Sequence, residues 1–137
     1  MGTRGQVRAL EIARLVGDRE AAEFLLPVLA PLAGLISTRG RDLTCIGRVL
    51  GDAAGFLGDH EAARGYYLQG LEVCRRARFR PEIALIRLGL AELLLEHHPD
   101  EKNEALEHLD FAIAEFREMK MQPSLERALK HKGLLTA

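Results

Sequence analysis

The sequence of 137 residues has no tryptophan, only two cysteines and few aromatic residues, and neither sign of charge is in excess. Its formal net charge of -1 provides no broad positive field for a polyanion, so we expect no direct nucleic-acid binding. The longest apolar runs, such as LGLAELLL, are much shorter than the roughly 20 residues of a membrane span, and no signal pattern is present. These absences predict a cytoplasmic protein that does not bind membranes.

The two cysteines, Cys45 and Cys74, are 29 positions apart, which matches neither a metal-ligand motif nor a disulfide framework. In a reduced cytosolic chain such residues are usually small, buried hydrophobes. The chain length and the 47% content of hydrophobic residues suffice for one core, so we expect a single domain over residues 1–137.

Three similar segments, REAAEFLL, HEAARGYY and NEALEHLDFAI, recur along the chain. Their alignment places Ala22, Ala63 and Ala105 in one column, at separations of 41 and 42 residues. The positions four and seven residues later hold Leu26, Tyr67 and Leu109, and then Leu29, Gly70 and Ala112. Small, large and small residues at i, i+4 and i+7 share one helix face, so the column predicts helical hairpins that cross closely at the alanines.

Residues that end and begin helices separate the copies. Gly17 and Gly58 are expected to end helices in the left-handed conformation, and Asp18 and Asp59 to cap the helices that follow. Asp100 is the expected cap in the third copy. No strand is needed, and the predicted helices span about 5–16, 18–33, 43–57, 60–78, 82–97, 101–120 and 123–134.

The predicted fold class is therefore all-α: an α-α superhelix of three hairpins plus a C-terminal helix. Pro27 and Pro31 lie inside the second predicted helix and should kink it or end it early. The stretch GLISTRGRD at 34–42 is the one long connection, and we expect it to be the most mobile loop.

The middle copy resembles the tetratricopeptide pattern, although the tryptophan of that pattern is absent and the unit is longer than the usual ~34 residues. The matching residues are Leu50, Gly51, Ala54, Gly58, Ala63, Tyr67, Gly70 and Leu71.

A narrower resemblance covers nearly the whole chain, in LAPLAG, CIGRVLG, GDHEAARGYY and ARFRPEIALIRLGLAELLLE through EALEHLDFAIAEFREM. These segments resemble the helical-repeat region of large bacterial ATP-dependent transcription regulators of the LuxR type, similar to MalT, and of related cyclase-linked signalling ATPases. The end sequences MGTRGQ and GLLTA are typical of cut points, so we expect a domain excised from a larger protein. The phosphate loop G-x-x-x-x-G-K-[ST] and a recognition-helix module are both missing, so neither ATP hydrolysis nor DNA binding is predicted.

No group of residues predicts catalysis or metal binding. His97 and His98 are adjacent beside Glu96, and adjacent histidines on a helix project about 100° apart, so they do not share one ion. Glu104 and His108 have the favourable i, i+4 spacing but no third ligand. The serines, threonines and cysteines lack a neighbouring base or a nucleophile elbow. We expect no enzyme activity, no cofactor and no metal.

Two surfaces are candidates for binding. A basic cluster at the end of the fourth helix is either a charged helix terminus or a site for an acidic partner; it comprises Arg75, Arg76, Arg78 and Arg80. In tetratricopeptide geometry, the first helices of the hairpins line the concave face. The candidate groove residues on that face are Glu11, Arg14, Arg48, Asp52, Phe56, Leu90 and Leu94.

Three functional interpretations stay open. The favoured one is a non-catalytic protein-interaction and regulatory domain of a bacterial signalling or transcription regulator, which binds a partner protein or the neighbouring domains of its parent chain. The second is a sensor domain for a small-molecule inducer, although the few aromatic residues disfavour sugar binding. The third is a free-standing tetratricopeptide adaptor.

The helix predicted at 82–97 is apolar nearly all round, so it must be covered on all sides. The last helix carries an apolar stripe that is expected to cover part of it as a cap, made of Leu125, Ala128, Leu129 and Leu135. If the cap is incomplete, the alternative is a homodimer through the ends of the solenoid.

Overall fold

The computed structural model is 84% helical and confirms the all-α class. It describes residues 2–37 and 43–136. Within these residues the α-helices are α1 (Thr3–Val16), α2 (Arg19–Leu29), α3 (Ile46–Phe56), α4 (His60–Arg76), α5 (Arg80–His97), α6 (Lys102–Glu118) and α7 (Gln122–Thr136). Two 3₁₀ turns, η1 (Ala30–Leu32) and η2 (Pro99–Glu101), follow α2 and α5. No helix of the described ranges combines the length and the apolar character needed to cross a membrane.

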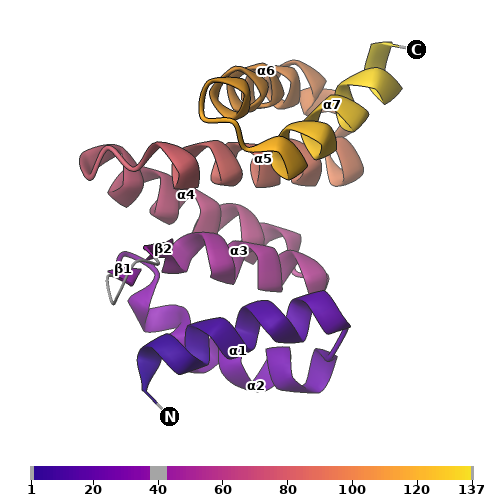
Figure 1. Cartoon of the computed structure of the whole chain (residues 1–137). Coiled ribbons are helices and arrows are strands. Elements are labelled where there is room, and N and C mark those ends of the chain that lie inside the picture. Colours follow the sequence, from indigo (N-terminus) through magenta and orange to yellow (C-terminus); the bar gives the residue numbers. More distant parts are fainter. Residues whose placement is uncertain (1, 38–42, 137) are drawn as a thin grey trace.

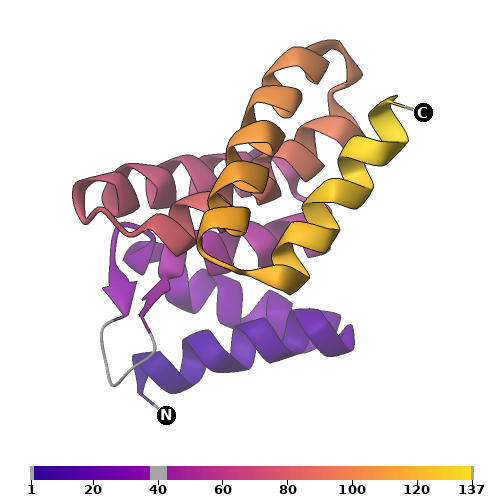
Figure 2. The same ribbon diagram turned by 45° about the horizontal axis from the view of Figure 1, so that its top comes forward.

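The helices form three stacked hairpins, α1–α2, α3–α4 and α5–α6, with α7 at the C-terminal end (Figure 1). The first helices of successive hairpins touch one another, because α1 contacts α3 and α3 contacts α5. Figure 2 shows α6 and α7 side by side, and α7 packs mainly on α6 while only its edge reaches α5. This stacking brings the first helices to one side of the array, as a superhelix requires.

The helix ends of the first two copies follow the sequence prediction. Gly17 directly follows α1 and Gly58 lies two residues after the end of α3. Both adopt the left-handed conformation, with φ of 77° and 86°. The side chain of Asp18 accepts a hydrogen bond from the backbone amide of Ala21 in α2, at 3.1 Å. Asp59 accepts one from the amide of Ala62 in α4, also at 3.1 Å. The predicted cap Asp100 is wrong: Pro99 opens a 3₁₀ turn, and Glu101 precedes α6 without a side-chain cap.

The prolines end the second helix early. The α-helical bonding of α2 stops at Leu29, two residues after Pro27, and η1 with Pro31 follows. A short antiparallel pair then forms where no strand was predicted, between β1 (Ile36–Ser37) and β2 (Thr44–Cys45). The pair aligns the chain as it enters α3, since the amide of Ile46 also donates to the carbonyl of Leu35. Most of the loop predicted to be mobile, residues 38–42, lies outside the described residues.

The core consists of three apolar clusters that follow the three hairpins. The alanines of the repeat column, Ala22, Ala63 and Ala105, are all fully buried. A close approach of two backbones also occurs between α3 and α4: a Cβ atom added to Gly47 would be 2.8 Å from the Cα atom of Gly70. The alanine column therefore marks buried helix contacts, and a pair of glycines marks another close one.

The cap predicted for α5 forms only in part. Ala128 of α7 is fully buried and Leu125 is half-buried, but both belong to the third cluster, against α6 as well as α5. Leu129 is 37% exposed, and the side chain of Leu135 lies outside the described part. α5 is covered chiefly by α4 and α6, because each flanks it as a hairpin neighbour.

Candidate functional site

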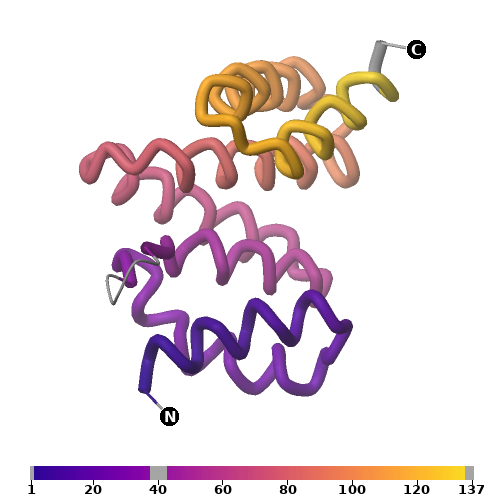
Figure 3. The backbone as a smooth tube through the Cα atoms, viewed as in Figure 1, coloured from indigo at the N-terminus to yellow at the C-terminus, as the bar shows by residue number. Residues whose placement is uncertain are grey.

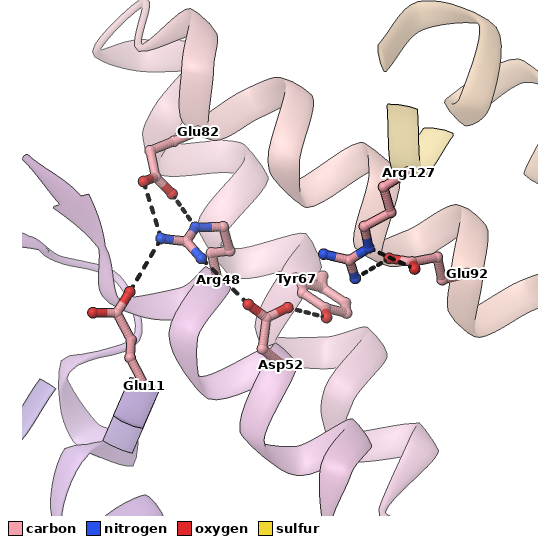
Figure 4. A network of polar contacts seen from close by, with 7 residues as sticks. All are labelled: Glu11, Arg48, Asp52, Tyr67, Glu82, Glu92 and Arg127. Carbon is pink, nitrogen blue, oxygen red and sulfur yellow. Dashed lines mark hydrogen bonds and ion pairs between the residues drawn. The ribbon is translucent and has the colours of Figure 1, made fainter. Parts of the chain in front are cut away.

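A network of charged side chains joins three helices on the side where the first helices meet (Figure 4). The guanidinium of Arg48, on α3, donates to Glu82 on α5 at 2.5 and 3.2 Å. It also donates to Asp52 one turn later at 3.3 Å and to Glu11 on α1 at 3.5 Å. One cation thus links successive hairpins through three carboxylates.

Burial and the ion pairs shift the pKa values of Glu82 and Arg48 in this network. Glu82 is 5% exposed and is the one buried charged residue among the described residues. Burial raises the pKa of the Glu82 carboxyl, and the guanidinium of Arg48 opposes that rise. Burial alone would lower the pKa of Arg48, but its carboxylate partners, Glu82 first, outweigh burial and raise it. Arg48 therefore stays charged and acts as the fixed centre of the cluster.

Tyr67 extends the network into the hairpin α3–α4. Its hydroxyl donates to the second carboxylate oxygen of Asp52 at 2.5 Å. Burial and the negative charge of Asp52 both raise the pKa of the tyrosine, so the hydroxyl stays protonated as a donor. The ring lies between Gly51 and Gly89, where an added Cβ atom would be 2.5 and 2.7 Å from ring atoms. Two glycines therefore provide the space that the ring occupies.

A cavity of about 290 Å³ opens above this tyrosine, on the side of the first helices. Its walls come from α1, α3, α5 and α7, and from the start and the middle of α4. Glu92 of α5 forms one wall and accepts two hydrogen bonds from Arg127 of α7, at 2.5 and 2.9 Å (Figure 4). His131 is 2.9 Å from the same carboxylate. These contacts fix the cavity wall between α5 and α7.

Two histidines line the rim of the cavity. The rings of His60 and His97 are stacked with centroids 3.4 Å apart, which joins the start of α4 to the end of α5. The Nδ1 atom of His60 is buried and has no hydrogen-bond partner among the described residues. Glu96 lies 3.4 Å from Nε2 of His97. The described residues contain no group of three or more His, Cys, Asp or Glu side chains arranged to hold a metal ion.

Arg14 differs from the other charged residues of the cavity. It belongs to the last turn of α1, is half-buried and lines the cavity. No hydrogen bond or ion pair of its side chain occurs within the described residues, whereas Arg48 and Arg127 are both paired. Phe56, half-buried at the end of α3, lines the same cavity. A cation and an aromatic ring are therefore available to an incoming group.

The structure divides the predicted groove. Arg14, Asp52 and Phe56 line the cavity, while Glu11 and Arg48 lie beside it in the charged network. Leu90 and Leu94 are only 2% and 1% exposed, so their placement in an open groove was wrong.

The side of α5 that faces the cavity instead carries Gly89, Glu92, Leu93 and Glu96. Because α5 is apolar nearly all round, its apolar residues identify no face. Glu92 and Glu96 were the useful signal, since they are four residues apart and therefore share one face of the helix.

The predicted basic cluster is partly neutralised. Arg80 is paired with Glu115 and Glu118 of α6, at 2.7 and 3.1 Å, and Arg76 with Glu72 at 2.5 Å. Arg75 and Arg78 are exposed, and the described residues give neither of them an ion pair. A charged helix end explains these residues better than a dedicated anion site does.

Both cysteines are fully buried, as predicted. The thiol of Cys45 contacts the carbonyl oxygen of Gly70 at 3.7 Å. A hydrogen bond with Cys45 and burial raise the pKa of the Cys74 thiol, so it is a packing residue rather than a nucleophile.

The chain matches no family model, no curated protein and no solved structure. The resemblance to the helical-repeat region of bacterial regulators therefore stays a prediction from sequence.

Proposed function

We propose that the chain is a non-catalytic protein-interaction and regulatory domain, of the kind found in bacterial signalling and transcription regulators. The observation that carries the proposal is the cavity between successive first helices, since its walls come from every hairpin and from α7. A segment bound there contacts all the layers of the array at once. Helical repeat proteins use the extended concave surfaces of their arrays for binding.

The available groups in the cavity favour an extended segment with an acidic side chain. Arg14 offers a guanidinium that has no carboxylate partner among the described residues, and guanidinium groups bind carboxylates through paired hydrogen bonds. Phe56 lines the same cavity, and the guanidinium of Arg19 lies 6.0 Å from the centroid of its ring. An acidic group that binds Arg14 breaks no existing ion pair, in contrast to one that binds Arg48 or Arg127.

The rest of the cavity is held in place before any partner binds. Asp52 is fixed by Arg48 and Tyr67, and Glu92 by Arg127. A fixed site loses less conformational entropy on binding. A partner that contacts Arg14 of the first hairpin and His97 of the third favours one arrangement of the hairpins, which is how binding is transmitted to neighbouring domains.

The test is selection from a random peptide library displayed on phage, with the unmodified 137-residue chain as the target. We expect the selected peptides to be acidic and to shift the amide resonances of Arg14, Phe56, His60 and His97. Arg14→Ala should weaken their binding at least tenfold, which corresponds to about 1.4 kcal/mol. Arg75→Ala is the matched control, because this arginine is exposed on the far end of α4, and it should bind as the parent does. Binding that is unaffected by Arg14→Ala would contradict the proposal.

The inducer-sensor function is a second candidate, favoured by the size of the cavity. Its volume of about 290 Å³ is close to the lower end of small-molecule sites, ~300 Å³. Arg14 and Glu96 offer charges of opposite sign to a small zwitterion or dicarboxylate. Calorimetry with amino acids and dicarboxylic acids distinguishes the two: saturable heat that Arg14→Ala abolishes, with no peptide selected, would favour the sensor.

A further inference from the structure

The first hairpin exposes five large apolar side chains. Ile12, Leu15 and Val16 of α1 are 52%, 71% and 71% exposed, and Phe24 and Val28 of α2 are 70% and 45% exposed. Together they present several hundred Å² of apolar area, in the range of the largest patch of a typical monomer, ~300–600 Å². Apolar patches in this range often have a binding function.

These side chains lie on the outer side of the hairpin. Ile12 is two residues from the buried Leu10, and Phe24 is two residues from the buried Ala22, which places each about 200° around its helix from the core. The buried sides of α1 and α2 pack in the first cluster with α3. The apolar residues therefore lie on the N-terminal end of the array, where Figure 1 shows no further helix.

Charged residues flank this apolar surface in an ordered way. Arg4 and Arg8 are exposed in the first half of α1, two turns and one turn before Ile12 respectively. Glu20 and Glu23 are exposed at the start of α2, where Glu23 is paired with Arg19 and Glu20 has no ion pair within the described residues. Since α1 and α2 run in opposite directions (Figure 3), the two starts lie at opposite ends of the hairpin. One end of the surface is therefore basic and the other has a net negative charge, and the apolar side chains extend from the middle toward the negative end, where α1 ends with Leu15 and Val16.

We propose that this surface binds the same surface of a second copy of the chain. A two-fold axis in the interface, running across the helices, places the basic end of each hairpin on the acidic end of the other. Ile12 and Phe24, near the middle of the hairpin, then meet their counterparts in the other copy. Such a contact is isologous and closed, because each copy supplies the same residues to it. Its charges are self-complementary, which fixes the antiparallel orientation.

Among the described side chains, the C-terminal end of the array offers no equivalent surface. The exposed positions of α7 include Glu126, Lys130 and Gln122, and the exposed large apolar residues there are Leu129 at 37% and Leu134 at 72%. Stacking of the first hairpin of one copy on α7 of the next would be head-to-tail and would grow into filaments. The apolar and charge patterns both favour the closed dimer.

The dimer is separate from the proposed partner site, which lies on the cavity side of the first helices. Its test is sedimentation velocity of the chain over micromolar to millimolar concentrations. We expect a monomer–dimer equilibrium with no larger species. Phe24→Glu should raise the dimer dissociation constant at least tenfold, whereas Leu134→Glu, at the opposite end, should leave it unchanged.

A pair of charge reversals keeps the test independent of folding. Arg8→Glu or Glu20→Arg alone should weaken the dimer, and the two changes together in one chain should restore it. Both residues are exposed, so neither change disturbs the core. A monomer at all concentrations, filaments, or loss of association in Leu134→Glu would each overturn the proposal, as would a double variant no stronger than the single ones.

Discussion

The second hairpin, α3–α4, and the third, α5–α6, fill the same repeat column in different ways. In the third, the column reads Ala105, Leu109 and Ala112, and it belongs to a buried cluster of apolar residues such as Phe116. A part-buried contact between Arg87 and His108 links α5 to α6 outside this column. In the second, the column reads Ala63, Tyr67 and Gly70, and the tyrosine hydroxyl donates to Asp52. The repeat column is apolar in the third hairpin, while in the second it contains a polar group that borders the cavity.

Glycines make that difference possible. Gly47 and Gly70 bring the backbones of α3 and α4 into contact, and Gly51 and Gly89 leave room for the ring of Tyr67. The third hairpin needs no such space, because leucine side chains fill its gaps. The comparison indicates that the second hairpin is built to position polar groups and the third to provide apolar stability.

The variant Arg48→Met should give the largest loss of stability among the tests of this comparison. The variant leaves the buried carboxylate of Glu82 without its cation, and breaking a buried ion pair costs about 3–5 kcal/mol. Arg76→Met removes the cation of an exposed pair in the same hairpin and should cost less than ~1 kcal/mol. Urea unfolding measures both. Equal costs would show that the charged network does not stabilise the second hairpin.

Gly47→Ala tests the contact between α3 and α4. Its Cβ atom would be 2.8 Å from the Cα atom of Gly70 and 2.9 Å from the carbonyl oxygen of Ala33, so backbones must move apart. Overpacking of this kind costs about 1–3 kcal/mol. Gly65→Ala is the control, since nothing lies within 4 Å of that position on α4, and it should stabilise by about 0.5–1 kcal/mol. A Gly47→Ala protein as stable as the parent would show that the crossing can widen freely.

The features that were predictable from sequence are local ones. The helices, and the ends at Gly17 and Gly58, follow from spacings and conformations within a few residues. The buried alanines followed from the repeat column. The predicted Asp100 cap failed on a local detail, because Pro99 favoured a 3₁₀ turn before α6.

The missed features depend on contacts between distant residues. Glu82 stands in the first turn of its helix, which usually faces solvent, and it is buried because Arg48 reaches it from α3, 34 positions earlier. The face of α5 that borders the cavity was also missed, since only packing against α4 and α6 decides which leucines are inside. The sequence thus predicted the fold and the side of the array that holds the cavity, but only part of its lining.

The pH dependence of stability gives a third test, on Glu82. Burial raises the pKa of this carboxyl in the folded state above that in the unfolded chain. Its favourable contribution is therefore complete below the unfolded pKa of ~4.3 and is lost as the pH rises through the folded pKa. Glu82→Gln does not titrate, so the stability of this variant relative to the parent should improve from pH 4 to pH 7.

Thermal unfolding at several pH values measures that difference. Glu72→Gln, which removes an exposed carboxylate from α4, controls for the loss of one surface charge. A relative stability of Glu82→Gln that falls with rising pH would mean that the attraction of Arg48 outweighs burial at this site.

The smallest expected effect is that of Tyr67→Phe, which removes the polar contact of the second hairpin and keeps the ring. Asp52 retains Arg48 as a partner, so the loss of one hydrogen bond should cost about 0.5–1.5 kcal/mol. Tyr66→Phe is the matched control on the same helix, because the described residues show no hydrogen bond of its half-buried hydroxyl, and it should change stability by less than ~0.5 kcal/mol. If both variants unfold at the same urea concentration, the hydrogen bond from Tyr67 to Asp52 adds nothing to stability. The second and third hairpins would then differ in shape alone.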